Sequence, residues 1–109
     1  METTQIAANY WVSPQLTVAD IAQAKEQGYT AIVCNRPDGE QAGQPTSDDI
    51  RSACEQAGLS FANLPMQGPN YTPAMVQELK DLLAKEDKVL GYCRTGNRSS
   101  VLYRATQEA

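Results

Sequence analysis

The sequence predicts an α/β fold with a central, largely parallel sheet flanked by helices. Short β-rich apolar segments alternate with helical segments almost throughout the chain, and most helical segments carry a capping signal. Such alternation is typical of βαβ units, whose crossover helices cover both faces of the sheet. The chain has 109 residues, 41% of them hydrophobic and 20% charged, so we expect one domain over residues 1–109.

The first strand and the first helix are marked by turn and capping residues. Residues 6–12 ("IAANYWV") form a β-rich run that ends at a Ser-Pro turn. Thr17 begins the helix that follows, and Asp20, three residues later, completes a near capping box. Gly28 ends this helix, and residues 29–35 ("YTAIVCN") predict a second, buried strand. A long polar loop comes next.

The second helix is expected to begin with Ser47 as its cap. Asp48 and Asp49 lie in its first turn, where acidic side chains favour the helix dipole. Its apolar residues recur at helical spacing along one face, which includes Cys54. Gly58 ends the helix, and the "SFANLP" segment that follows predicts the third strand.

The third helix begins at Thr72 and Pro73, which serve as its cap and first turn. The strand "KVLGY" then leads to Cys93, and a last helix is expected from about Ser99 to the chain end. Ligands of parallel sheets bind beyond the carboxyl ends of the strands. Cys93 lies at such an end.

The net charge of −4 and the absence of histidine narrow the range of functions. Nucleic-acid-binding proteins are usually basic, so no nucleic-acid partner is expected. Histidine is the commonest metal ligand, and the three cysteines form no Cys-x-x-Cys pair, so we expect no metal site and no cofactor.

The segment "METTQIAANYW" has neither a basic region nor a long apolar run. We therefore expect no signal peptide and no membrane association. An odd number of cysteines argues against a disulfide framework, and the expected location is the cytoplasm, where thiols stay reduced.

The stretch "YCRTGNRSS" combines features of an anion-binding loop with a nucleophile. Gly96 permits a tight loop whose N–H groups point inward, and a helix beginning near Ser99 directs its positive end to the same place. A cysteine there loses its proton easily. The alternative is an ordinary turn with an incidental cysteine. The predicted catalytic residues are Cys93 and Arg98, and the predicted anion-binding residues are Arg94, Thr95, Gly96, Asn97 and Ser99.

These residues also carry a family resemblance. "YCRTGNRS" resembles the active-site loop of single-domain rhodaneses and the phosphate-binding loop of cysteine phosphatases. Residues 9–40, which include "NRPDGE", are similar to the opening of the bacterial phosphatase-like family often labelled beta-lactamase-hydrolase-like. The resemblance covers nearly the whole chain and implies the fold of dual-specificity protein tyrosine phosphatases. No segment resembles the rhodanese "GHIPGA" sequence.

The length of the loop separates sulfur chemistry from phosphate chemistry. Four residues lie between Cys93 and Arg98, as in rhodaneses, whereas tyrosine phosphatases have five. Tyr92 stands where those phosphatases usually have histidine, and Gln67 stands near the expected position of their acid, so a proton donor is missing. We therefore expect a sulfurtransferase that takes sulfur from thiosulfate or a persulfide onto Cys93 and passes it to a thiol.

Two alternatives stay open. A cysteine phosphatase acting on phosphate esters would take Asp38 or Glu40 as its acid, and a non-catalytic sensor would use the loop to hold an anion or to report oxidation of Cys93. The resemblance also implies a partner of the persulfide dioxygenase type, because the family occurs fused to such domains.

The "NRPDGE" segment follows a strand that is expected to neighbour the Cys93 strand. Arg36, Asp38 and Glu40 are therefore possible supporting residues, although Pro-Asp-Gly is also a common turn sequence. Asp38 or Glu40 is expected to pair with an arginine of the loop. Cys34 ends the same strand, either as a core residue or as a resolving thiol for Cys93.

Overall fold

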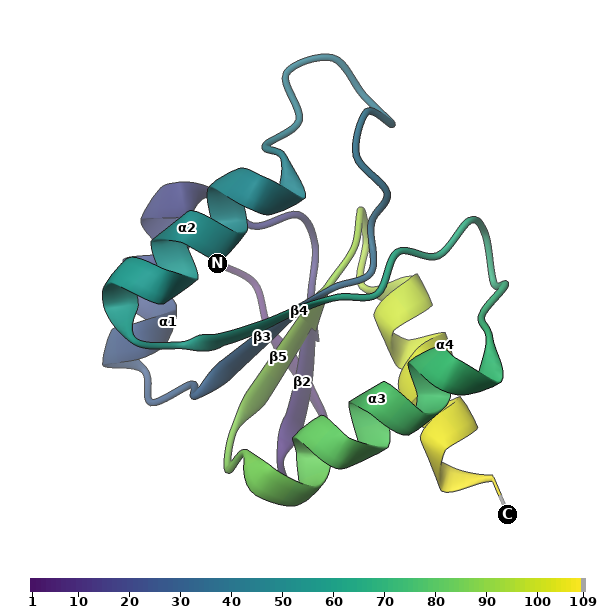
Figure 1. Ribbon diagram of the computed structural model, residues 1–109. Coiled ribbons are helices and arrows are strands. Elements are labelled where there is room, and N and C mark those ends of the chain that lie inside the picture. The colour runs from purple at the N-terminus through teal and green to yellow at the C-terminus, as the bar shows by residue number, and fades with distance from the viewer. Residues whose placement is uncertain (109) are drawn as a thin grey trace.

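The structure is a computed structural model that describes residues 1–108. Its five-stranded sheet has the order β1-β2-β5-β3-β4, and every neighbouring pair except β1–β2 is parallel (Figure 1). The predicted α/β class with a largely parallel sheet is confirmed. The strands are β1 (Thr4–Ala7), β2 (Tyr10–Ser13), β3 (Ala31–Cys34), β4 (Ser60–Asn63) and β5 (Val89–Tyr92), and the helices are α1 (Val18–Glu26), α2 (Ser47–Ala57), α3 (Pro73–Lys85) and α4 (Asn97–Gln107).

The single strand expected over residues 6–12 is wrong, because this region forms an antiparallel hairpin of β1 and β2. Asn9 lies in the turn, a position that asparagine favours. Its side-chain amide donates to the carbonyl of Leu83 at 3.2 Å, and its own carbonyl accepts from Val89 N at 2.9 Å. These bonds fix the turn against α3 and β5.

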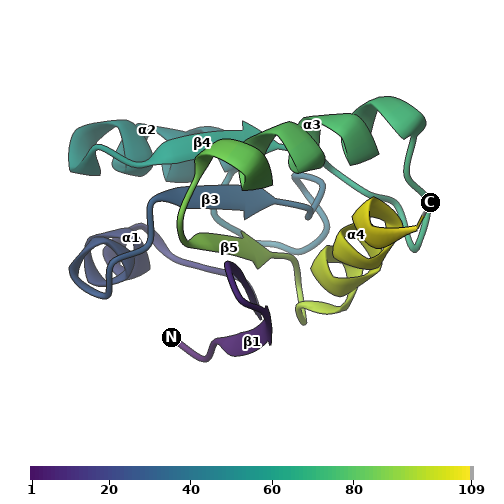
Figure 2. The same cartoon turned by 90° about the horizontal axis from the view of Figure 1, so that it is seen from below.

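Helices cover both faces of the sheet, as predicted. Helices α1 and α2 pack on one face, and α3 and α4 pack on the other (Figure 2). Each face has its own apolar cluster. The first contains Ile21, Ile50 and Leu90, and the second contains Val33, Leu79 and Leu102, all fully buried. Burial of this apolar surface is the main stabilising contribution to the fold.

Threonine residues cap the N-termini of three helices. Thr17 forms the predicted capping box with Asp20, and Thr72 caps α3 ahead of Pro73. The predicted cap of α2 is wrong by one residue. Thr46 is the cap and accepts from Asp49 N at 3.1 Å, because the neighbouring serine hydroxyl is bonded elsewhere.

Helix α4 begins at Asn97, two residues earlier than predicted. Gly96 is its N-cap and has a left-handed backbone with φ +95°, a conformation that glycine adopts at little cost. Among the described residues no side chain caps this helix, and Ser99 and Ser100 lie within it. The N–H groups of its first turn are left available to another acceptor.

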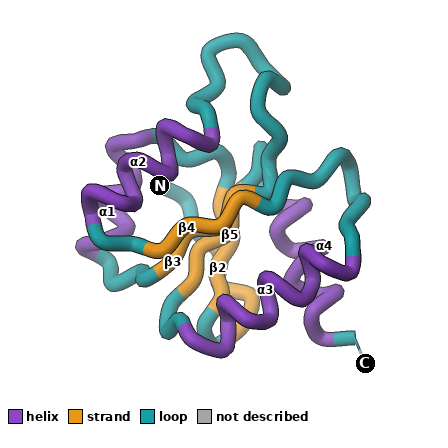
Figure 3. Tube along the Cα trace, viewed as in Figure 1, coloured by secondary structure: helices purple, strands orange, loops and turns teal. Residues whose placement is uncertain are grey.

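The parallel strands direct their carboxyl ends to one edge of the sheet. The long loops after β3 and β4 gather there with the short loop after β5 (Figure 3). None of the helices within residues 1–108 is long and apolar enough to cross a membrane.

Candidate active site

Cys93 lies directly after β5, at the start of a short loop that folds back around its sulfur. Its amide donates to the carbonyl of Ser13 at the end of β2, at 3.4 Å. Three residues later, the amide of Gly96 donates to Cys93 Sγ at 3.0 Å. The side chain is only 1% exposed, so the sulfur lies at the floor of the loop.

The loop favours the thiolate form of Cys93. Burial raises the pKa of this thiol, but the backbone N–H groups of Ser99, Thr95, Arg98 and Gly96 act on the sulfur and lower the pKa below its ordinary value. Because no side chain caps α4, these amides are free to do so. The arrangement is that of an activated nucleophile at a helix N-terminus.

Glu40 links the polar loop after β3 to the cysteine loop. Its Oε1 accepts from Arg36 Nε at 2.9 Å and from an Arg98 terminal nitrogen at 2.8 Å, and its Oε2 accepts from the other Arg98 terminal nitrogen at 2.7 Å. Hydrogen bonding to Arg98, opposed by burial and supported by Arg36, lowers the pKa of Glu40 to about 2. This carboxylate is therefore ionised at neutral pH.

Arg98 is held from several directions. Besides Glu40, it donates to the carbonyl of Met66 at 2.9 Å. Hydrogen bonding to Glu40 raises the pKa of the guanidinium, with a further contribution from the sulfur of Cys93. Arg98 thus carries a permanent charge beside the nucleophile.

Arg36 is buried at the edge of the site and donates a hydrogen bond to Glu40. It is 3% exposed, and its remaining donors reach Gln15 at 3.1 Å and Gln41 at 3.4 Å. Sequence reasoning missed both glutamines. The available signal was position, since Gln15 follows β2 at the carboxyl edge of the sheet and Gln41 adjoins Glu40.

Asn35 is a second residue that sequence reasoning missed. Its amide donates to Tyr92 O at 2.8 Å, its side chain donates to Leu64 O at 2.8 Å, and its carbonyl accepts from Met66 N at 3.0 Å. These bonds tie the end of β5 to the loop after β4. Asn35 thereby places the Met66 carbonyl against Arg98.

Asp38 lies away from this group. Its two oxygens accept from Ser47 N at 2.8 Å and from Ser47 Oγ at 2.9 Å. The carboxylate therefore fixes the first turn of α2, where negative charge is favoured, and within residues 1–108 it pairs with no arginine. Of the two acids considered for pairing with Arg98 or Arg94, Glu40 is the one that does so.

A cavity of about 580 Å³ opens above the loop and is lined by Arg36, Glu40, Gln41, Arg94 and Arg98. Arg94 is exposed at its border. Thr95 and Asn97 are also exposed, and Thr95 Oγ1 accepts from Asn97 N at 3.3 Å. An anion in this cavity would meet arginine side chains close to the thiolate.

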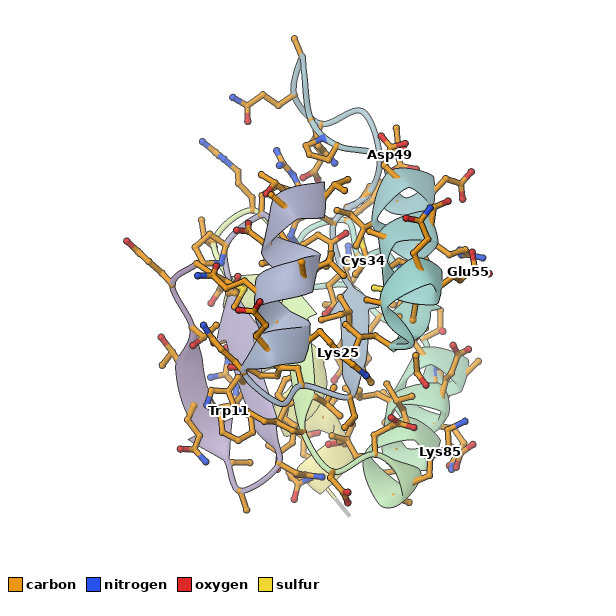
Figure 4. The ribbon with its side chains drawn as sticks, turned by 90° about the vertical axis from the view of Figure 1, so that its left-hand side faces the viewer. Trp11, Lys25, Cys34, Asp49, Glu55 and Lys85 are labelled. Carbon is orange, nitrogen blue, oxygen red and sulfur yellow. The ribbon has the colours of Figure 1, made fainter. Side chains whose placement is uncertain are left out.

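The other two cysteines lie in the core. Cys34 Sγ donates to the carbonyl of Arg36 at 3.3 Å, and its side chain lies between α1 and α2 (Figure 4). Burial raises the pKa of both thiols, in Cys54 to about 12. Neither borders the cavity.

Comparison with known proteins decides the family. The family described as "Beta-lactamase hydrolase-like protein, phosphatase-like domain" matches residues 3–109. The chain belongs to this family. A beta-lactamase hydrolase-like protein of Agrobacterium fabrum is 32% identical over 104 residues, which are 94% of this chain and 24% of that protein. The chain thus spans about a quarter of the length of the curated relatives it matches.

Solved structures of the same architecture are phosphatases or phosphatase-like proteins. A "putative phosphatase" of Neisseria meningitidis is 35% identical, with a TM-score of 0.80 over 96% of this chain and 78% of that one. The catalytic domain of a PP-IP phosphatase from S. cerevisiae shares only 9% identity, with a TM-score of 0.67 over 96% of this chain and 64% of that one. This second likeness concerns the fold alone.

The family is therefore that of a phosphatase-like domain, and the fold is the tyrosine-phosphatase-like fold that the resemblance implied. These relatives agree with the phosphatase alternative of the sequence analysis. None of them supports the sulfurtransferase that we expected from the loop.

Proposed function

We propose that the chain transfers a group through Cys93, and that this group is a sulfane sulfur. The observation that carries the proposal is the pair of hydrogen bonds from Arg98 to Glu40, which keeps this carboxylate ionised. Within residues 1–108 it is the one carboxylate that lines the cavity, and the lowered pKa of about 2 leaves it no proton to give at neutral pH. Glu40 therefore does not serve as a general acid, which favours a reaction whose leaving group departs without a proton.

Sulfur transfer meets this requirement. The Cys93 thiolate attacks the outer sulfur of thiosulfate or of a low-molecular-weight persulfide and forms a new S–S bond. The S–S bond of the donor breaks, and sulfite or a thiolate leaves with the electron pair. A second thiolate then attacks the outer sulfur of the Cys93 persulfide, and the enzyme thiolate returns as the leaving group.

The cavity offers a place for an anionic donor. Arg94 lies at its border, where it can approach a sulfonate or carboxylate. Arg98 holds its orientation through Glu40 and Met66. The backbone amides that act on Cys93 Sγ would likewise stabilise charge on a bound persulfide.

A phosphatase is the second candidate, and the comparisons favour it over the first. The family is phosphatase-like, and the Neisseria protein that carries the name is 35% identical. On this reading, Cys93 attacks phosphorus and forms a phosphocysteine that water hydrolyses. With Glu40 ionised, the substrates would be esters whose leaving group is itself acidic, such as aryl phosphates.

Intact-mass measurement after incubation with thiosulfate separates these candidates. Sulfur transfer predicts a gain of one sulfur atom that is absent in Cys93→Ser, persists in Cys54→Ala, and is lost again when cyanide is added. Turnover of an aryl phosphate without sulfur loading would instead establish the phosphatase. Neither activity, with an ordinary pKa for Cys93, would indicate the non-catalytic sensor.

If the chain transfers sulfur, we propose that it also binds a partner protein of the persulfide dioxygenase type. Support comes only from the family resemblance, since the structure contains this chain alone. Binding of such a protein, measured with the sulfur-loaded chain and with Cys93→Ser, tests this extension.

A further inference from the structure

Two hydroxyl groups beneath the cysteine loop are buried without a hydrogen-bond partner. Tyr10 and Ser99 are each 0% exposed, and neither Tyr10 Oη nor Ser99 Oγ has a partner within residues 1–108. An unpaired buried hydroxyl typically costs about 1–3 kcal/mol. Such groups are uncommon and call for an explanation in terms of function or of another state of the site.

The two hydroxyls belong to the same small region, which Gly91 leaves open. A Cβ atom on Gly91 would lie 2.0 Å from Tyr10 Oη and 3.3 Å from Ser99 Cβ. Tyr10 reaches this point from β2, and Ser99 reaches it from the first turn of α4. Glycine at position 91 therefore makes room for the hydroxyl of Tyr10 next to Ser99.

Ser99 also borders the nucleophile. Its backbone N–H is one of the groups that act on Cys93 Sγ, so the Cα of Ser99 lies close to the sulfur. Rotation about χ1 moves a serine hydroxyl between staggered positions. The hydroxyl has one proton to donate and lone pairs to accept with, so it can bond to a sulfur and a phenol at the same time.

We propose that Tyr10 is a positioning residue for the nucleophile. Its hydroxyl donates to Ser99 Oγ, which in turn donates to Cys93 Sγ when the sulfur carries negative charge. Both buried hydroxyls then have partners. The inference rests on the proposed role of Cys93 as a nucleophile, and it holds for either transferred group.

Tyr10 is suited to act as a permanent donor. Burial raises its pKa well above the ordinary value, with further contributions from Cys93 and Tyr103, so the phenol keeps its proton at neutral pH. The other ionisable groups that interact with Cys93 are Arg98 of α4 and Cys34 of β3. None of these is altered by changes to the two hydroxyls.

The test compares the pH dependence of Cys93 alkylation in single and double variants. Tyr10→Phe removes the hydroxyl and keeps the ring that stacks on Tyr103 at a centroid distance of 5.0 Å. We expect Ser99→Ala to raise the apparent pKa of Cys93 by about one unit and Tyr10→Phe by about half a unit. In the Ser99→Ala background, Tyr10→Phe should add no further shift.

Tyr103→Phe is the matched control, because it removes the hydroxyl of the stacked ring and should leave the pKa of Cys93 unchanged. Thermal unfolding verifies that each variant is folded. The relay is the proposed chain of hydrogen bonds from Tyr10 through Ser99 to Cys93. An unchanged Cys93 pKa in Tyr10→Phe would overturn it, and so would an equal shift from Tyr10→Phe in the wild-type and Ser99→Ala backgrounds. An unchanged pKa in Ser99→Ala alone would also overturn it.

Sulfur loading is measured in parallel and keeps the two hypotheses apart. A Tyr10 effect on alkylation without any sulfur loading would reject sulfur transfer and leave the relay standing. Normal loading without a Tyr10 effect would reject the relay alone.

Discussion

Both carboxylate oxygens of Glu40 accept hydrogen bonds from the guanidinium of Arg98, at 2.7 and 2.8 Å. Because Arg98 also interacts with the sulfur of Cys93, we expect the ion pair to restrict access to this residue, which is 1% exposed. Glu40→Gln should loosen Arg98 and speed the alkylation of Cys93 by about fivefold, which corresponds to an ion pair of ~1 kcal/mol. The rate should be measured at a pH where the thiol is fully ionised, so that only access changes.

Glu78→Gln is the matched control for this change, since Glu78 is exposed on α3 and does not line the cavity. It should leave the alkylation rate unaltered. An equal rate in Glu40→Gln and the wild type would show that the ion pair does not guard the sulfur.

The same ion pair predicts how stability depends on pH. The pKa of Glu40 is lowered to about 2 from an ordinary value of 4.5, mainly by Arg98. Its contribution is therefore fully present above about pH 4.5 and is lost as the pH falls toward 2. Urea unfolding midpoints across this window should converge for the wild type and Glu40→Gln. A constant difference between them at all pH values would contradict the assignment.

Thiol reactivity should single out Cys93. Its pKa is lowered, whereas burial raises the pKa of Cys34 and of Cys54. At pH 7 the modification of Cys93 by iodoacetamide should be faster than that of the other two by on the order of tenfold or more. Peptide mapping assigns the sites. The rate of Cys93 modification should fall as the pH drops through the lowered pKa of its thiol. Preferential labelling of Cys34 would refute the prediction.

Gly91 should not tolerate a side chain. A Cβ there would lie 2.0 Å from Tyr10 Oη and 2.8 Å from Tyr10 Cζ, so Gly91→Ala should destabilise the fold by about 1–3 kcal/mol through overpacking. Denaturant unfolding measures the loss. Adding Tyr10→Phe should restore part of it, and strict additivity of the two changes would argue that the groups do not meet.

Asp38 should matter for stability and not for the reaction. Asp38→Ala leaves the buried hydroxyl and amide of Ser47 without their acceptor, which should cost about 1–3 kcal/mol. Alkylation of Cys93 should remain as in the wild type. Ser47→Ala combined with Asp38→Ala should cost less than the sum of the two single changes. A loss of Cys93 reactivity in Asp38→Ala would place this residue in the site after all.

The sequence was sufficient for the fold class and for the place of the cysteine loop between the last strand and the last helix, because both depend on local signals. Capping at Thr17 and Thr72, the apolar strands and the Cys-to-Arg spacing are each encoded within a few residues. The β1–β2 hairpin was missed because its turn is fixed by a long-range bond from Asn9 to Leu83.

The residues that contact the cysteine loop could not be predicted from local sequence either, because they lie far from it along the chain. Arg98 meets Glu40 across 58 positions of sequence and Met66 across 32. Asp38 and Glu40 could not be told apart in the sequence. The folded loop separates their roles, because it brings Asp38 to Ser47 and Glu40 to Arg98. Gln15 and Asn35 support the site through contacts that no sequence motif indicates.

The burial of Cys34 has a consequence for damage by oxidants. Its sulfur donates a hydrogen bond to the Arg36 carbonyl inside the core, so we expect it not to trap a sulfenic acid formed on Cys93. We then expect recovery from peroxide to come from a thiol in solution, such as glutathione, through a mixed disulfide. Without that thiol, oxidation of the nucleophile would proceed to irreversible sulfinic and sulfonic acids.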